Sequence, residues 1–175
     1  MRTLILTFLL LVFSHNGFAN DQVSKLDKLK AAYMFNFVKF ITWPADNTNE
    51  VEATQSNNSE PLTFCLQTSA EFKGFFEALA NTQVIGPQQK SIKSILLEEA
   101  VECDLVYLTA KYDDAYSKLS RAVVIQNSEL VESRLSVFTF FKQNNRLRFE
   151  IDLQRAKQLK IDISSELLKL AKVKQ

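Results

Sequence analysis

Histidine, the side chain that most often carries acid–base and metal chemistry, is nearly missing from this sequence. Its 175 residues contain one histidine, His15, which follows an apolar N-terminal stretch. Without an imidazole elsewhere, the chain has no Ser-His-Asp or Cys-His arrangement and no histidine ligand for zinc. The three glycines are far apart, so there is no glycine-rich phosphate loop and no dinucleotide-binding fingerprint. These absences exclude the commonest hydrolase, zinc-enzyme and nucleotide-binding patterns.

Clustered carboxylates are the next candidates for chemistry, because paired acids can transfer protons and oxygen-rich clusters can hold calcium. Neither cluster in this chain has the spacing of a calcium loop, and neither lies on a helical face between aromatic residues. We therefore interpret both as solvated turns. We predict no catalytic residue, no cofactor, no metal and no enzymatic activity. The clusters are Glu98, Glu99, Glu102 and Asp104, followed by Asp113 and Asp114.

Two cysteines, Cys65 and Cys103, are the remaining reactive side chains. They are too far apart for a C-x-x-C redox motif, and two cysteines alone do not make a structural zinc site. In an oxidising compartment they can form a disulfide, which the chain-entropy model values at roughly 4 kcal/mol for a loop of this size. Two buried, reduced and inert thiols are the alternative. We predict the disulfide.

The N-terminus has the pattern of a secretory signal peptide. Met1-Arg2 is positively charged, an uncharged and largely apolar run follows from Leu4 to Phe13, and Gly17-Phe18-Ala19 offers a cleavage site. The apolar run is shorter than the ~20 residues that a membrane-spanning helix needs. We predict a signal peptide over 1–19, an exported domain over 20–175, a periplasmic location and no direct membrane insertion.

Basic and acidic side chains are balanced, with 21 lysines and arginines against 20 aspartates and glutamates. Nucleic-acid binding requires a basic surface that neutralises phosphates, so this composition predicts no nucleic-acid partner. The length fits one domain with enough chain to bury a substantial core.

The stretch KAAYMFNFVKFITWP, residues 30–44, indicates an amphipathic helix over residues 21–41. At about 100° per residue, apolar side chains form a line along one side of this helix. Such a broad apolar face is buried in a core or bound to a partner. Trp43-Pro44 ends the helix, because a residue before proline is pushed out of the helical region. The line comprises Leu26, Leu29, Tyr33, Phe37 and Phe40, widened by Met34, Val38 and Ile41.

Apolar segments that alternate with helical ones predict an α/β fold, a mixed β-sheet flanked by helices. Thr68 and Glu71 form a capping box before a helix with aromatic residues at helical spacing. A turn or short helix is expected at 98–100 and a weak helix at 113–120. The expected strands are 61–67, 90–97, 103–109 and 122–126.

The C-terminal part predicts an antiparallel hairpin at one side of the sheet. Its arms are 135–142 and 146–153, and Asn144-Asn145 between them suits a tight turn with positive φ. Apolar and charged residues alternate along the second arm, so one face is buried and the other is wet. The final segment SSELLKLAKV is expected to be a helix that Ser164 caps, with the C-terminal lysines at its end.

Both ends of the predicted domain resemble the YfiR-like family of small exported regulators. The KAA, the tyrosine, the aromatic-Asn-Phe and the Trp-Pro of residues 30–44 are similar, in this order, to that family's signature helix. Residues 146–174 resemble its second hallmark, a strand, a short turn, a Ser-Ser cap and a leucine-rich helix. The cysteines fall where many members carry them. The sequence departs from the family pattern at Gln126-Asn127, Ser133-Arg134 and Asp152.

The resemblance implies a regulator that binds the periplasmic sensor part of an inner-membrane diguanylate cyclase and holds it inactive, so that cyclic-di-GMP stays low. It also implies homodimer formation. Phe35 lies apart from the main apolar line, so we hypothesise that it contributes to a dimer or partner surface. The disulfide is then either a redox switch or a structural link. A periplasmic small-molecule-binding protein remains the alternative. The candidate motif and interface residues are Tyr33, Phe35, Asn36, Phe37, Trp43 and Pro44.

Overall fold

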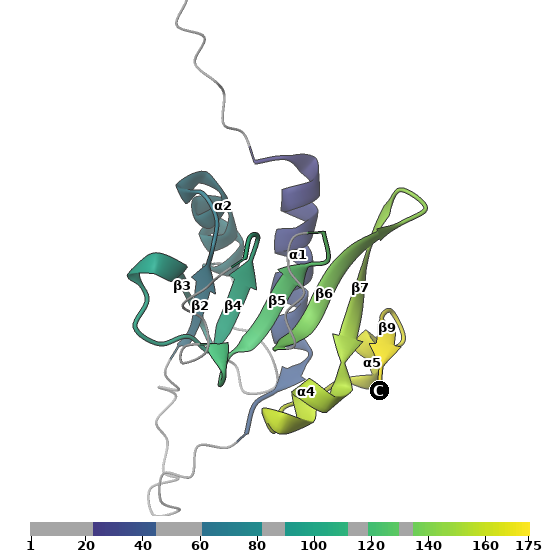
Figure 1. Cartoon of the computed structure of the whole chain (residues 1–175). Coiled ribbons are helices and arrows are strands. Elements are labelled where there is room, and N and C mark those ends of the chain that lie inside the picture. The colour runs from purple at the N-terminus through teal and green to yellow at the C-terminus, as the bar shows by residue number, and fades with distance from the viewer. Residues whose placement is uncertain (1–22, 45–60, 82–89, 112–118, 130–134) are drawn as a thin grey trace, which may run out of the picture.

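The computed structural model of this protein describes residues 23–44, 61–81, 90–111, 119–129 and 135–175. The strands of its main sheet are β2 (Leu62–Leu66), β3 (Ile92–Leu96), β4 (Leu105–Leu108), β5 (Val123–Asn127), β6 (Ser136–Gln143), β7 (Arg146–Asp152) and β9 (Lys172–Lys174). Their order is β3-β2-β4-β5-β6-β7-β9 (Figure 1). All neighbours are parallel except β6 and β7, which form the antiparallel hairpin. The predicted mixed α/β fold is confirmed.

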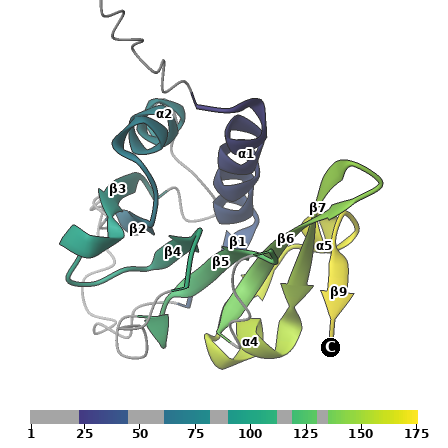
Figure 2. The same cartoon turned by 45° about the horizontal axis from the view of Figure 1, so that its top comes forward.

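Two helices, α1 (Lys25–Lys39) and α2 (Ala70–Ala80), lie side by side on one face of the sheet (Figure 2). Shorter elements complete the fold: the 3-10 helix η1 (Leu97–Glu99), α4 (Leu153–Gln158) and α5 (Ser165–Leu168). The turn or short helix expected at 98–100 therefore corresponds to η1. The predicted signal peptide and most of the helix expected at 113–120 lie outside the described residues. Within those residues, no helix is both long and apolar enough to cross a bilayer.

Helix α1 is held on the sheet by aromatic packing. The Phe37 ring lies nearly parallel to that of Phe138 in β6, with the ring centroids 4.3 Å apart. It also contacts Phe140 at 5.6 Å and Phe149 of β7 at 4.9 Å. Phe76 of α2 packs edge-to-face on Phe64 of β2 at 4.8 Å. Ring pairs at these distances add to the stabilisation from burial itself, so aromatic contacts help to hold both helices on the sheet.

The buried face of α1 differs from the predicted line. Its fully buried residues are Ala31, Met34, Phe37 and Val38. Leu29, expected on the buried line, is 45% exposed. Met34 and Val38, which widen the predicted line, are buried as expected, so Leu29 is the member of the predicted apolar arc that the structure leaves exposed.

The predicted C-terminal end of α1 is also wrong. The helix ends at Lys39, and Ile41–Thr42 form β1, a short strand antiparallel to β8 (Asp162–Ile163). The Phe40 carbonyl accepts a hydrogen bond from the Ser164 backbone N–H at 2.9 Å. This pairing with a segment far along the chain overrides the helical periodicity that continues through Ile41.

The start of α2 is displaced by one residue from the prediction. Ser69, not Thr68, is the N-cap, and its hydroxyl accepts a hydrogen bond from the Phe72 backbone N–H at 3.4 Å. The hairpin turn is as predicted, since Asn144 and Asn145 have φ values of 50° and 58°. Arg146 and Arg148 are exposed, as expected for the wet face of the second arm.

The C-terminal helix is much shorter than predicted, and β7 is not an edge strand. Ser164 caps α5 as expected, but the helix ends at Leu168 and the chain continues as β9 beside β7. Lys172 and Lys174 therefore do not lie at a helix end. They form ion pairs with Glu150 at 2.6 Å and Asp152 at 3.1 Å. Leu153, expected in the hairpin arm, instead begins α4. The chain after α5 pairs with the backbone of β7, and its lysines pair with the β7 carboxylates. This pairing accounts for the short α5 and for the interior position of β7.

Arg155 on α4 is a buried charged residue that sequence reasoning missed. Only 8% of this residue is exposed. Its guanidinium donates hydrogen bonds to the carbonyl oxygens of Ser120 at 2.6 Å and Leu135 at 3.2 Å, and to the Gln158 side chain at 3.1 Å. Burial lowers the pKa of Arg155, and the nearby Asp152 carboxylate opposes that effect. Arg155 thus joins α4 to the segments that enter β5 and β6.

Replacing Arg155 is expected to destabilise the fold. Arg155→Ala removes the hydrogen bonds that the guanidinium donates to the carbonyl oxygens of Ser120 and Leu135, and it removes a largely buried side chain, so the free energy of unfolding should fall by about 2–4 kcal/mol. Denaturant titration measures this change. Arg148→Ala on the exposed face of β7 is the matched control and should change stability by no more than about 0.5 kcal/mol. Equal effects of the two substitutions would contradict a structural role for Arg155.

Candidate functional site

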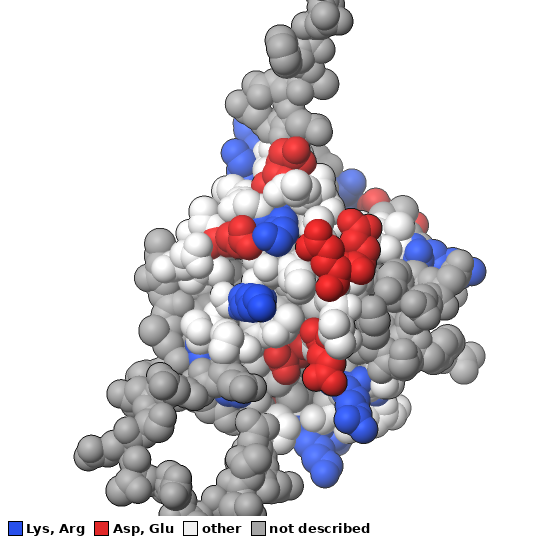
Figure 3. All heavy atoms as spheres, turned by 90° about the vertical axis from the view of Figure 1, so that its left-hand side faces the viewer, with Lys and Arg blue, Asp and Glu red and all other residues white. Residues whose placement is uncertain are grey.

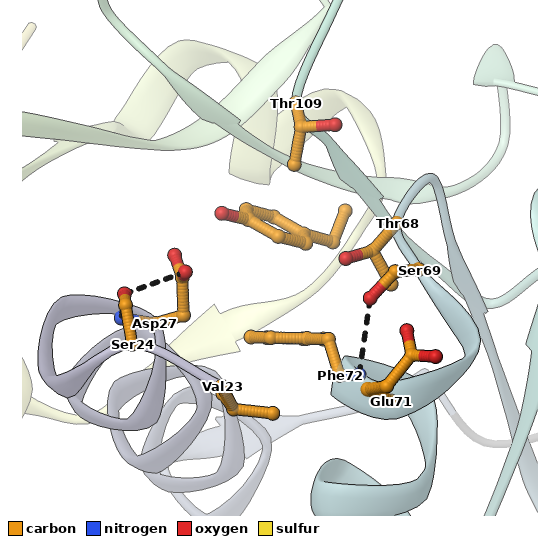
Figure 4. Close-up of a pocket in the computed structure, with 9 residues that line it drawn as sticks. Val23, Ser24, Asp27, Thr68, Ser69, Glu71, Phe72 and Thr109 are labelled. Carbon is orange, nitrogen blue, oxygen red and sulfur yellow. Dashed lines mark hydrogen bonds between the residues drawn. The ribbon is translucent and has the colours of Figure 1, made fainter. Parts of the chain in front are cut away.

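A cavity of about 350 Å³ lies between the N-terminal ends of α1 and α2, where β2 and β4 end (Figure 4). Its lining residues are Val23, Ser24, Asp27, Thr68, Ser69, Glu71, Phe72, Tyr107 and Thr109. Figure 4 shows the Phe72 side chain extending from α2 toward Val23 and α1. The cavity is therefore built from two helix starts and two strand ends that are distant in sequence.

The topology of the sheet creates this opening. From β2 the chain passes through α2 to β3 on one side, whereas β4 is followed by β5 on the other side. Connections that diverge from two adjacent parallel strands leave a crevice at their carboxyl ends. Such crevices are the usual ligand-binding positions of open α/β sheets.

The helix starts at the cavity are capped by the protein's own side chains. The Ser24 hydroxyl accepts a hydrogen bond from the Asp27 backbone N–H at 3.1 Å and donates one to the Asp27 carboxylate at 2.7 Å. The pKa of Glu71 is lowered, first by its own backbone N–H and then by the Ser69 hydroxyl. Glu71 therefore remains an anion at neutral pH.

Tyr107 of β4 contributes a buried phenol to the cavity. The residue is only 1% exposed, and its ring packs against Phe72 with 5.9 Å between centroids. Its hydroxyl oxygen accepts a hydrogen bond from the Asn127 amide at 3.4 Å. Burial raises the pKa of Tyr107 to about 12, so the phenol stays neutral and keeps its proton to donate.

Gln67 and Thr109 fix the rim of the cavity. The Gln67 side-chain oxygen accepts hydrogen bonds from the backbone N–H groups of Thr109 at 3.1 Å and Ala110 at 2.9 Å. The Thr109 hydroxyl donates to the Gln67 carbonyl at 2.7 Å. These bonds join the chain leaving β2 to the chain leaving β4, so the rim is held by direct contacts.

The predicted disulfide between Cys65 and Cys103 is present, with an S–S distance of 1.97 Å and a Cα–Cα distance of 5.8 Å. Cys65 is buried in β2, and Cys103 precedes β4. Beside it, the Asp104 carboxylate accepts a hydrogen bond from the Thr63 backbone N–H at 2.7 Å. The disulfide belongs to the smaller hydrophobic cluster, with Val106 and Leu108, rather than to the core beneath α1 and α2. It therefore links two adjacent strands away from the cavity.

The six family-motif residues do not form one cluster. Phe37 is fully buried, whereas Tyr33, Phe35 and Trp43 are half-buried and pack against the same core. Asn36 and Pro44 are exposed. The interface role of these residues stays a prediction.

The carboxylate clusters remain separate from the cavity. Glu98, Glu99 and Glu102 are exposed at and just after η1. On that side of the molecule acidic and basic side chains are interspersed (Figure 3). Asp113 and Asp114 lie outside the described residues. In the described part of the chain, no three histidine, cysteine or acidic side chains gather as metal ligands would.

The sequence profile of the YfiR/HmsC-like family matches residues 27–172, which is most of the chain. The protein belongs to the YfiR/HmsC-like family. The match includes both cysteines, most of α1 and the strands β2 to β7 of the main sheet. No curated protein matches the sequence.

Sequence reasoning did not identify the cavity of this YfiR/HmsC-like domain. Thr68 and Glu71 were interpreted as a helix cap, and Tyr107 lay unnoticed within a buried strand. Two features of the sequence could have indicated the cavity. One is the phenol within the apolar run CDLVYLT, and the other is the pair of serine and acidic residues at each of two helix starts. Their convergence depends on the strand order, which the sequence pattern does not specify.

Removing the disulfide is expected to destabilise the domain without unfolding it. Cys65→Ala combined with Cys103→Ser frees a loop with a sequence separation of 38. The free energy of unfolding should fall by about 2–4 kcal/mol, measured by denaturant titration. The wild-type protein in reductant is the control and should lose a similar amount. A wild-type protein whose stability is insensitive to reductant would contradict this expectation.

Proposed function

We propose that the protein is a non-enzymatic regulator that binds the periplasmic sensor part of an inner-membrane diguanylate cyclase and keeps that cyclase inactive. The observation that carries this proposal is family membership over residues 27–172. The resemblance at both ends of the domain implies the same role. Bound to its partner, the protein would keep cyclic-di-GMP low until a signal weakens the complex.

The proposal places the protein in the periplasm. Residues 1–19 would be removed as a signal peptide, leaving 20–175 as the exported domain. The Cys65–Cys103 disulfide supports an oxidising compartment, because such bonds persist there and are rare in the cytosol. A regulatory rather than enzymatic role is supported by the sequence, whose one histidine would leave with the signal peptide.

We place the partner-binding surface on the outer face of α1. Leu29 is a large apolar residue that is 45% exposed there. Lys25, Lys28 and Lys39 are exposed on the same helix, and Phe35 is half-buried at its side. An exposed apolar side chain among lysines suits a partner surface that is apolar at its centre and acidic around it. A homodimer through the side of α1 that carries Phe35 is part of the proposal.

Crosslinking in living cells tests the proposed role. A tagged protein is crosslinked in the periplasm and the attached proteins are identified by mass spectrometry. Recovery of a membrane diguanylate cyclase, with raised cyclic-di-GMP in cells that lack the regulator, is the expected result. Recovery of a different sensor would overturn the cyclic-di-GMP link. Recovery of the protein itself alone, at good crosslinking yield, would overturn the regulator role in favour of the small-molecule-binding alternative.

Substitutions on α1 test the proposed surface. Leu29→Glu places a charge on an exposed position, so the domain should fold and capture of the partner should fall about tenfold. The matched control is Val101→Glu, because Val101 is 84% exposed and lies outside α1. Equal capture by Leu29→Glu and Val101→Glu would contradict the location on α1.

The variant Phe35→Glu tests the proposed dimer by light scattering. A folded monomer is expected, whereas unfolding would make Phe35 a core residue.

A further inference from the structure

We propose that the cavity between the starts of α1 and α2 binds a small organic amine in its protonated form. Its ammonium group would lie near Glu71, with Asp27 adding negative charge on the opposite side of the cavity, and its apolar part would lie against Phe72, Tyr107 and Val23. This ligand site is independent of the proposed cyclase partner, because it requires only residues of this chain.

The size and position of the cavity suit a small ligand. Its volume of about 350 Å³ is at the lower end of the range for small-molecule sites. It lies where the connections from β2 and β4 diverge, and the Gln67–Thr109 hydrogen bonds hold its rim in place. A cavity shaped before binding costs little ordering free energy when the ligand enters.

The charges around the cavity favour a cation over an anion. Helix N-termini commonly bind anions through free backbone N–H groups. Here Ser24 already accepts from the Asp27 N–H and Ser69 from the Phe72 N–H. The described residues that line the cavity include two carboxylates and no lysine or arginine. An anionic ligand would meet two like charges beside helix starts that are already capped.

Lys30 is the lysine that approaches the cavity, and it leaves both carboxylates able to pair with another cation. Lys30 approaches Asp27 with 3.8 Å between charged atoms, near the outer limit for an ion pair. Glu71 has no lysine or arginine within 4.0 Å among the described residues. Its lowered pKa keeps it ionised and able to attract an ammonium group.

Aromatic and phenolic groups complete the recognition surface. The Phe72 and Tyr107 rings pack together at an interplanar angle of 27°, and aromatic faces attract ammonium groups. The Tyr107 oxygen accepts from Asn127, whose own side-chain oxygen is buried without a partner among the described residues. The phenol itself has one hydrogen bond among the described residues, the 3.4 Å bond from Asn127. A buried, neutral donor that lines the cavity can therefore bind an acceptor atom of the ligand.

The proposal predicts charge selectivity among probes of similar size. Phenethylamine, 2-phenylethanol and 3-phenylpropionate carry a similar aromatic body with positive, neutral and negative ends. Purified exported protein is titrated with each by calorimetry and by thermal shift, since a ligand of the folded state raises the melting temperature. Phenethylamine should bind at least about tenfold more tightly than 2-phenylethanol, and 3-phenylpropionate most weakly. Equal or tighter binding of the anion, or no binding of the amine at about millimolar concentration, would overturn the proposal.

Matched variants locate the binding site. Glu71→Gln removes one charge and leaves the Ser69 cap, so the amine's affinity should fall about tenfold. Glu71→Gln with Asp27→Asn should abolish the preference for amine over alcohol. Glu98→Gln, an exposed carboxylate at η1, is the control and should bind like the wild type. An unchanged affinity in Glu71→Gln would overturn the site. Because no partner protein is present, these results do not depend on the cyclase.

Discussion

The stacking of Phe37 on Phe138 is the contact on which the arrangement of this domain depends. With 4.3 Å between ring centroids and further contacts to Phe140 and Phe149, it fixes α1 across β6 and β7. One end of the helix then brings Ser24 and Asp27 to the cavity, and the other brings Ile41 beside Ile163. Loss of this packing would disturb both ends of α1, since a short helix is held mainly by tertiary contacts.

The C-terminal segment closes the other side of the domain by charge as well as by packing. Glu150 and Asp152 on β7 pair with Lys172 and Lys174 on β9, which extends the sheet beyond the hairpin. These pairs are partly exposed and individually weak. Arg155 is different, because its buried guanidinium joins α4 to two other backbone segments through hydrogen bonds. Backbone pairing and this buried arginine, more than the surface ion pairs, therefore hold the C-terminal elements in place.

The disulfide and the proposed ligand cavity involve the same two strands, β2 and β4, but different hydrophobic clusters. The disulfide and its hydrophobic neighbours form the smaller cluster, whereas the cavity opens among α1, α2 and the strand ends. Helix α1 connects the cavity with the surface proposed for the partner, because Asp27 and Leu29 occupy its first turns. A single helix can therefore carry both a ligand contact and a protein contact, and the two can be tested by different variants.

Local patterns in the sequence determined much of this protein. Helical spacing located most of α1 and α2, apolar runs located the strands, and Asn144-Asn145 located the hairpin turn, because each depends on neighbouring residues. Tertiary structure decided the rest. Ile41 leaves its helix to pair with Ile163, residues 172–174 pair with β7, Arg155 finds carbonyl groups from two other segments, and Tyr107 meets Asp27 and Glu71 at one cavity. Each of these outcomes requires partners distant in the chain, and periodicity along a single segment carries no information about which distant segment will be adjacent.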